Sequence, residues 1–233
     1  MSTLIRLGAT AVLGFVVGWL TAARRVSDLN AMLRVADYLA GHDRLTGLPN
    51  RYVAAQAFTG WEVIGQPITV VLLDLDGFKQ VNDVHGHYVG DELLRVVAER
   101  LAPIATARGG LAARLAGDEF LILLPSQHDA DVPIGQILAA VAEPVVLRGD
   151  EGTIVIAPRA SAGIAAFDGE HGTFDTLLHH ADVALYHAKG RQGGFRTYRP
   201  PMRMPRNASR HGPRLRDTRR HAAPGQQDGP VDR

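Results

Sequence analysis

The sequence predicts an α+β fold in which the central sheet is at least partly antiparallel. Apolar runs of strand length lie at residues 68–73, 111–115 and 120–124, and a short acidic turn joins the last two, which is typical of a hairpin. Helical patterns lie around these runs without the strict alternation of strand and helix that a parallel sheet needs. One transmembrane helix is expected before this domain.

Composition sets the class of protein. The chain has 233 residues, of which 46% are apolar and 21% charged, and this mix excludes a fully disordered or fibrous protein. Cysteine is absent, which excludes disulfides, a thiol nucleophile and a cysteine-based zinc site. Residues 199–233 carry a net charge of +6 against a total of +1, which leaves the rest of the chain mildly acidic at −5. The C-terminal segment is therefore basic, whereas the rest of the chain is mildly acidic.

Residues 1–25 are predicted to form a membrane anchor. Residues 7–23 are uncharged, a length near the lower limit for a spanning helix, and arginines flank this run. Arg24 and Arg25 keep the following domain in the cytoplasm, so we expect a single-pass protein of the inner or cell membrane. A cleaved signal peptide and a buried soluble helix are the alternatives.

Residues 26–41 are predicted to form a connecting helix, because apolar residues recur there at spacings of three and four. The members of this stripe are Val26, Leu29, Leu33, Ala36 and Ala40. The stripe can pair with a second copy as a short coiled coil, or it can pack on the chain's own domain. The sequence leaves both alternatives open.

The C-terminal segment, residues 199–233, is predicted to be disordered. It contains six prolines and nine arginines and has few large apolar side chains, so it cannot bury enough surface to offset its chain entropy. Such a basic tail can touch anionic lipid or nucleic acid, or it can remain solvated without a partner. We expect no nucleic-acid partner.

The predicted globular body, residues 42–198, contains further elements. Residues 89–101 have helical periodicity and precede Pro103. Residues 154–167 read as one or two strands interrupted by Pro158, and residues 174–188 read as a helix.

Acidic residues stand at two strand ends of this body. Asp74 directly follows the run at 68–73, while Asp118 and Glu119 lie in the hairpin turn. If these strands are neighbours, the carboxylates converge and repel one another, and a divalent cation such as Mg²⁺ relieves that repulsion. An exposed turn that merely happens to be acidic is the alternative.

Five motifs in order resemble those of GGDEF domains, the diguanylate cyclases. Residues 43–51, DRLTGLPNR, resemble the opening DxLTGLxNR signature. The following motifs are D-x-D-x-F-K-x-x-N-D at 74–83, G-H-x-x-G-D at 86–91, AGDEF at 116–120 and A-D-x-A-L-Y-x-A-K at 181–189. Together they span almost the whole body, which makes the resemblance far more specific than any single short pattern.

This resemblance implies a fold like the palm of nucleotide cyclases and polymerases, with a central, mostly antiparallel sheet flanked by helices. It also implies a reaction. Two GTP molecules, one on each of two facing domains of a homodimer, condense to cyclic di-GMP with loss of two pyrophosphates. Each 3′-hydroxyl attacks the α-phosphorus of the other nucleotide.

The resemblance also implies roles for individual residues. Asp74 and Asp118, with the carbonyl of Leu75, would hold Mg²⁺, for which Mn²⁺ can substitute. Asp118 and Glu119 would be catalytic, with Glu119 beside the reacting hydroxyl. The residues that would bind substrate are Asn82, Asp91, Phe78, Lys79, Gly117 and Lys189.

Each substrate-binding role has a chemical basis. Asn82 and Asp91 would read guanine. The Asp91 carboxylate can accept hydrogen bonds from both N1–H and N2–H₂ of the base, a pair of donors that adenine lacks. Backbone N–H groups around Phe78 and Lys79 would cradle phosphate, and Lys189 would neutralise it. Lys79 and Lys189 are the only two lysines among the 25 basic residues.

Two positions depart from the family pattern at the site. Ala116 stands where the family has glycine, and its methyl group lies close to the expected α-phosphate. Gly193 stands where the family often has arginine, so Arg191 or Arg196 would have to reach the phosphates. These departures keep a second interpretation open, in which the domain is catalytically silent and regulates by binding GTP or a partner protein.

A third departure concerns regulation. The inhibitory product site of the family is an RxxD sequence that ends six positions before the name-giving motif. Ala107 and Gly110 occupy its two defining positions here. We therefore expect no inhibition by cyclic di-GMP through this site.

Overall fold

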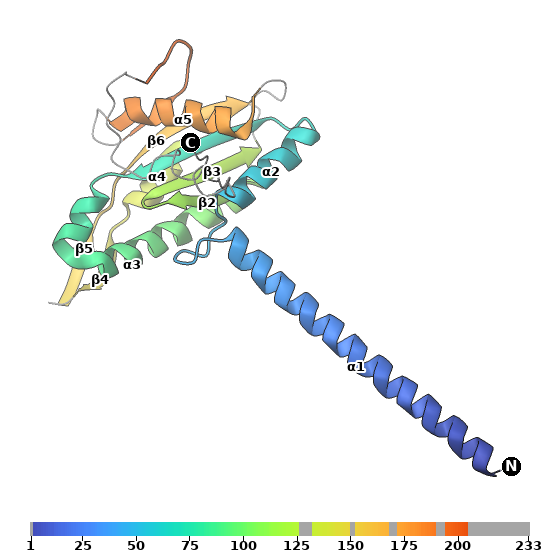
Figure 1. Ribbon diagram of the computed structural model, residues 1–233. Coiled ribbons are helices and arrows are strands. Elements are labelled where there is room, and N and C mark those ends of the chain that lie inside the picture. Colours follow the sequence, from blue (N-terminus) through green and yellow to red (C-terminus); the bar gives the residue numbers. More distant parts are fainter. Residues whose placement is uncertain (1, 126–131, 150–151, 168–171, 190–193, 205–233) are drawn as a thin grey trace, which may run out of the picture.

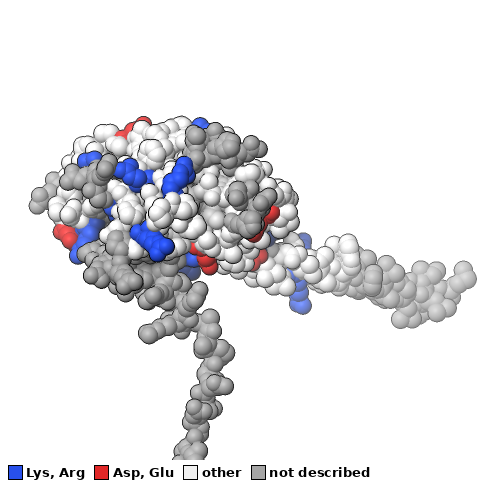
Figure 2. Space-filling model, turned by 90° about the horizontal axis from the view of Figure 1, so that it is seen from above, with Lys and Arg blue, Asp and Glu red and all other residues white. Residues whose placement is uncertain are grey.

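The computed structural model of the protein comprises a domain and a long N-terminal helix that extends away from it (Figure 1). The view from above shows the same arm projecting from the body (Figure 2). Side chains are described from residue 18 onward. The residues that the structure describes are 2–125, 132–149, 152–167, 172–189 and 194–204.

A five-stranded sheet forms the centre of the domain, in the order β2-β3-β1-β6-β7. Only β6 and β7 pair in parallel, and every other neighbouring pair is antiparallel. This confirms the predicted α+β fold with a mostly antiparallel sheet. The strands are β1 (Ile68–Leu75), β2 (Leu111–Ala116), β3 (Glu119–Pro125), β6 (Ala160–Phe167) and β7 (Gly194–Thr197).

Helices cover both faces of this sheet (Figure 1). Helices α3 and α4 pack on one face, and α2 and α5 pack on the other. The helices of the domain are α2 (Arg51–Val63), α3 (Phe78–Thr106), α4 (Ile134–Ala142) and α5 (Phe174–Lys189).

The central strand β1 is buried along its whole length, because both of its faces are covered. Val71 and Leu73 belong to the core under α3, whereas Val70 and Leu72 belong to the core under α2 and α5. This explains why the strand reads as an unbroken apolar run rather than as an alternating pattern.

The region predicted as one or two strands at 154–167 contains two, and they belong to different sheets. Strand β5 (Gly152–Ile156) pairs with β4 (Val145–Gly149) in a separate hairpin, and β6 joins the central sheet. Pro158 lies between β5 and β6, and the break that it predicted is present.

Helix α3 is longer than the predicted helix at 89–101. It begins at Phe78, bends at Gly86, whose backbone is non-helical with φ 84°, and continues through Pro103 to Thr106. A proline so near the C-terminal end removes one intrahelical hydrogen bond without ending the helix. The bend at Gly86 is the reason why no single periodic pattern extends over the whole helix.

Helix α1 (Ser2–Gly41) contains both the predicted anchor and the predicted connecting helix. All residues from 18 to 40 are exposed, so the apolar stripe does not pack on the chain's own domain. Among residues with described side chains, no helix has the length and apolar character needed to cross a membrane. Residues 7–17 of the predicted anchor lie outside that set, as do residues 205–233 of the predicted disordered tail, and both remain predictions.

Candidate functional site

The acidic residues of two strand ends meet at one edge of the sheet. Strands β1 and β3 are neighbours, and Asp74 lies directly opposite Glu119 in their register. Residues opposite each other in neighbouring strands project to the same face of the sheet. Asp118 lies in the β2–β3 turn, and its carbonyl accepts a hydrogen bond from the Leu75 N–H at 3.4 Å. The convergence expected from the sequence is thus present.

A cavity of about 580 Å³ opens at this edge. Its wall combines three carboxylates, three cationic side chains and the beginning of α3. The lining residues are Asp74, Leu75, Asp76, Gly77, Phe78, Lys79, Gln80, Asp118, Arg159 and Lys189. Among the described residues, the cavity therefore unites the predicted metal ligands with both lysines.

Burial and neighbouring charges shift the pKa values of the carboxyl groups in this cavity. Burial raises the pKa of Asp74 to about 6, and the charges of Asp118 and Asp76 raise it as well, while the ion pair with Lys189 opposes the shift. The Lys189 Nζ lies 2.6 Å from the Asp74 Oδ1. Burial also raises the pKa of Asp118. Carboxylates placed so close together favour a bound cation.

Asp76 is a third carboxylate of the cavity, and β6 holds it in place. Its backbone N–H donates to the carbonyl of Arg159 at 2.8 Å, and the Ser161 hydroxyl donates to its Oδ1 at 2.9 Å. Its Oδ2 is buried and accepts no hydrogen bond within the described part of the chain. Asp76 therefore adds negative charge to the cavity, a contribution for which the sequence analysis proposed no role.

The donor set fits a hard divalent ion. Mg²⁺ is usually bound by one or two carboxylates, with water and substrate phosphate completing its shell. Asp74 and Asp118 supply two carboxylates, and Leu75 lines the same cavity. Over the described ranges, no group of three or more His, Asp or Glu side chains can hold an ion by itself.

The first turn of α3 forms the other side of the cavity. Gly77 precedes the helix with φ 75°, a left-handed conformation that favours glycine and turns the chain sharply from β1 into α3. The first N–H groups of any helix lack intrahelical acceptors and favour anions. Phe78 and Lys79 begin α3 and line the cavity, and their role in binding phosphate stays a prediction.

The predicted guanine-reading residues lie further along α3, outside the cavity lining. The Asn82 Oδ1 is buried and accepts no hydrogen bond from the residues that the structure describes. A Cβ placed on Gly90 would lie 1.8 Å from that oxygen and 3.2 Å from the Phe78 Cζ, so glycine permits this close packing. Asp91 is exposed next to Gly90. The bend at Gly86 thus brings the two predicted guanine ligands to one region.

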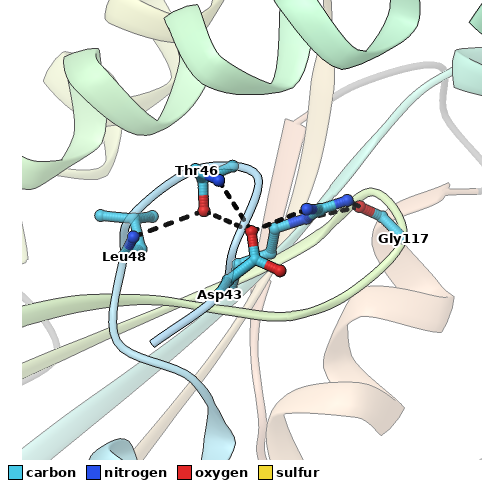
Figure 3. A network of polar contacts seen from close by, with 5 residues as sticks. Asp43, Thr46, Leu48 and Gly117 are labelled. Carbon is cyan, nitrogen blue, oxygen red and sulfur yellow. Dashed lines mark hydrogen bonds and ion pairs between the residues drawn. The ribbon is translucent and has the colours of Figure 1, made fainter. Parts of the chain in front are cut away.

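Arg114 is a residue of the site that the sequence analysis missed. Its guanidinium contacts the Asp43 Oδ1 at 2.8 Å, and its Nε and Nη2 donate to the Gly117 carbonyl at 2.9 and 2.7 Å. Asp43 also accepts from the Thr46 N–H and hydroxyl, so the loop after α1 is joined to the AGDEF turn (Figure 3). The sequence did contain a signal for such a role, because Arg114 lies two positions before the AGDEF motif in an otherwise apolar strand.

The conformation of the AGDEF turn follows from its residues. Gly117 has φ 53°, the positive value that a two-residue hairpin turn requires at its first position. Ala116 is the last residue of β2, whose pairing with β3 shifts register between Arg114 and Ala116. Arg196 lies in β7 outside the cavity lining, while Gly193 and Arg191 lie outside the described residues.

At the positions of the RxxD sequence, Gly110 lies close to neighbouring backbone. A Cβ there would lie 2.3 Å from the Leu123 carbonyl oxygen and 2.7 Å from the Leu124 Cδ2. An aspartate would therefore have to displace the strand. The expected absence of the inhibitory site remains a prediction for solution measurements.

Comparison with known proteins supports the resemblance to GGDEF domains that the sequence motifs indicate. The family model described as "Diguanylate cyclase, GGDEF domain" matches residues 40–194. The bifunctional diguanylate cyclase/cyclic di-GMP phosphodiesterase MucR of Pseudomonas aeruginosa is 39% identical over 165 residues, 66% of this chain and 23% of MucR. The cyclic di-GMP phosphodiesterase NbdA of the same organism is 34% identical, over 71% of this chain and 23% of NbdA. The chain thus matches less than a quarter of the length of each of these two relatives.

A solved structure has the same fold. The coiled coil and GGDEF domain of DgcB from Caulobacter crescentus, in complex with c-di-GMP, matches with a TM-score of 0.66 and 29% identity. The match covers 76% of this chain and 94% of that one. The matched DgcB structure includes a coiled coil in addition to the domain.

Proposed function

The chain belongs to the GGDEF domain family, and from this premise we propose that it is a diguanylate cyclase, a nucleotidyltransferase that converts two GTP to cyclic di-GMP. The observation that carries the proposal is the cavity at the sheet edge. Asp74, Asp118 and Lys189 line it together with the first turn of α3. This combination provides carboxylates for a metal and backbone N–H groups for a triphosphate.

In this proposal Asp74, Asp118 and the Leu75 carbonyl hold Mg²⁺ or Mn²⁺. When bound, the ion neutralises charge on the phosphates and on the departing pyrophosphate. Glu119 projects to the same face as Asp74. It accepts the proton of the attacking 3′-hydroxyl or stabilises the charge that develops there. A bond forms between that oxygen and the α-phosphorus of the other nucleotide. The bond between this phosphorus and the oxygen that bridges to the β-phosphate breaks, and pyrophosphate leaves.

The remaining residues position the nucleotide. The N–H groups at Phe78 and Lys79 bind phosphate, Gly117 lets the turn approach it closely, and Lys189 neutralises its charge. Asn82 and Asp91 read the guanine edge. The buried, unused acceptor of Asn82 supports this role, because a buried acceptor is stable only when it meets a donor.

Two copies of the chain are required, because one domain presents one nucleotide. The exposed stripe on α1 supports pairing with a second copy, since Leu29 and Leu33 are 58% and 52% exposed in the single chain. We further propose that residues 7–23 anchor the dimer in the inner or cell membrane and that the domain lies in the cytoplasm, where GTP is present.

A second candidate function is a silent GGDEF domain that regulates by binding GTP or a partner protein. Ala116 favours it, because its methyl group narrows the space beside the α-phosphate. The absence of arginine at position 193 favours it as well.

The two functions are separated by incubating the full chain with GTP and Mg²⁺ and identifying the products by mass spectrometry. The matched control is Asp118→Asn, which keeps the shape of the side chain and removes its charge. Cyclic di-GMP from the parent and none from the variant supports the cyclase. GTP binding by a dimer that forms no product supports the regulatory domain.

A further inference from the structure

We propose that Lys189 is a built-in counter-ion, which occupies the cation position on Asp74 in the nucleotide-free chain and leaves it when metal and nucleotide bind together. The inference rests on the proposed function in one respect, which is that the acidic cavity is the place where metal and phosphate bind. It gives Lys189 a second role besides phosphate binding, and it makes metal and nucleotide binding depend on each other.

The geometry places an ammonium group on the carboxylate that would hold the metal ion. The Lys189 Nζ lies 2.6 Å from the Asp74 Oδ1, and the Asp74 side chain is only 7% exposed. A buried carboxylate is costly without a partner, and the ammonium supplies that partner from within the chain. Asp118 lines the same cavity and also interacts electrostatically with Lys189.

Lys189 is able to leave this position. It is the last residue of α5, and its side chain is 41% exposed, so the ammonium reaches Asp74 from the solvent side on a flexible stem. Lysine is a compact point charge on a flexible stem, without the fixed fork with which arginine holds a carboxylate through two parallel hydrogen bonds. The pair is therefore suited to exchange its cation.

Simultaneous binding of both cations to Asp74 is unfavourable. A divalent ion and an ammonium on one carboxylate would stand within a few ångströms of each other and repel. Metal alone must therefore displace Lys189 into solvent. A triphosphate gives the displaced ammonium a new anionic partner, so the nucleotide strengthens metal binding and, by linkage, metal strengthens nucleotide binding.

The test measures Mn²⁺ alone, without nucleotide, by titration with electron paramagnetic resonance of the free ion. The full chain is compared with Lys189→Met, which keeps the length of the side chain and removes its charge. We expect the variant to bind Mn²⁺ about fivefold more tightly or better, within the usual range of coupling between two sites. A lysine that serves phosphate alone leaves this affinity unchanged.

Two control variants make the result specific. Lys79→Met removes one positive charge from the wall of the same cavity, and no ion pair with Asp74 is described for Lys79. It should tighten Mn²⁺ binding clearly less than Lys189→Met does. Asp74→Asn should abolish the tight binding in the Lys189→Met background, which places the ion at Asp74.

Equal or weaker Mn²⁺ binding by Lys189→Met overturns the inference, and so does an equal gain from Lys79→Met or binding that survives Asp74→Asn. The absence of Mn²⁺ binding in all variants overturns it too. In the same titration with GTP added, Lys189→Met should show a smaller gain in Mn²⁺ affinity than the parent. None of these measurements needs turnover, so a chain that makes no cyclic di-GMP can still pass the test.

Discussion

Asp74 is one of the residues that make the stability of the domain depend on pH. Its pKa in the folded chain is about 6, against an ordinary value of 3.8. Between these values the folded chain holds a proton that the unfolded chain has lost, so the free energy of unfolding falls as the pH rises from about 4 to 6. Above pH 6 the folded chain carries the full cost of this buried charge.

Asp74→Asn removes that titration. The variant should gain stability relative to the parent as the pH rises through this window, by on the order of 1–3 kcal/mol. Urea unfolding at pH 4.5 and pH 7.5, without divalent ions, measures the change. If the stability difference between the two proteins is equal at both pH values, Asp74 does not titrate with a raised pKa in the folded chain.

Arg114 is the residue on which the shape of the AGDEF turn depends. Burial alone would raise the pKa of Asp43, but hydrogen bonds from Arg114 and Thr46 outweigh it and hold that pKa below its usual value. Arg114→Ala should cost about 1–3 kcal/mol of unfolding free energy, because it removes the ion pair of Asp43 and the two side-chain hydrogen bonds to the Gly117 carbonyl. Cyclase activity should fall further than the stability, since Asp118 lies next in the turn.

The matched control for this prediction is Arg51→Ala. Arg51 forms an ion pair with Asp175 at 2.7 Å, but the Asp175 side chain is 71% exposed. Exposed pairs contribute roughly 0–1 kcal/mol. Equal losses from the two substitutions, measured by thermal unfolding together with initial rates, would show that Arg114 is an ordinary surface residue.

At the level of single residues, the sequence could predict which residues belong to the site but not which side chains contact one another. Asp74, Asp118 and Lys189 were predicted to act in one site, and all three line one cavity. The ion pair between Asp74 and Lys189 was not predictable, because it joins the end of β1 to the end of α5. Arg114 was missed because its partners lie in the loop after α1 and in the hairpin turn.

Helix α3 is bent at Gly86, and the segments before and after the bend pack closely against each other. Gly90→Ala should place a methyl group against Asn82 and Phe78, and the neighbour at 1.8 Å cannot be accommodated without movement. We expect the KM for GTP to rise about tenfold or more, with kcat changed less, because guanine reading is disturbed. Steady-state kinetics measure both constants.

Gly60→Ala is the control within the same fold. Gly60 lies inside α2, and a Cβ there meets nothing within 4 Å. Alanine should therefore stabilise that helix by about 0.5–1 kcal/mol and leave KM unchanged. If Gly90→Ala behaves like Gly60→Ala, the proposed packing of Asn82 is wrong.

Among the elements, those with strong periodicity were predictable and the others were not. Strand β1, the β2–β3 hairpin and α5 follow their sequence patterns closely. Helix α2 was missed, although Asn50 caps it by accepting from the N–H groups of Tyr52 and Val53. Helix α4 and strand β4 were missed because their short apolar runs do not distinguish helix from strand.

At the scale of the whole molecule, the described residues form a domain and an arm of about 60 Å, the length expected for a 40-residue helix. The apolar stripe on this arm is exposed in the single chain, and burying it in a dimer is favourable. Replacing Leu29 and Leu33 together by glutamate should therefore weaken the dimer. Specific activity should then fall steeply with dilution into the nanomolar range, where the parent retains activity.

Sedimentation and initial rates over the same concentrations measure this effect. Asp28→Glu, a neighbouring substitution that adds no charge, is the matched control. Unchanged activity of the double variant at nanomolar protein would show that the arm does not bring the domains together. The exposed stripe was visible in the sequence, but only the structure shows that the domain does not cover it.

The central claim is that the cavity at the sheet edge converts GTP to cyclic di-GMP. The most direct measurement is the stoichiometry of products from the full chain with GTP and Mg²⁺, with cyclic di-GMP and pyrophosphate quantified in the same reaction. We expect one cyclic di-GMP for every two pyrophosphates, and loss of both products in Glu119→Gln. Pyrophosphate without cyclic di-GMP, or product formation that Glu119→Gln leaves intact, would contradict it.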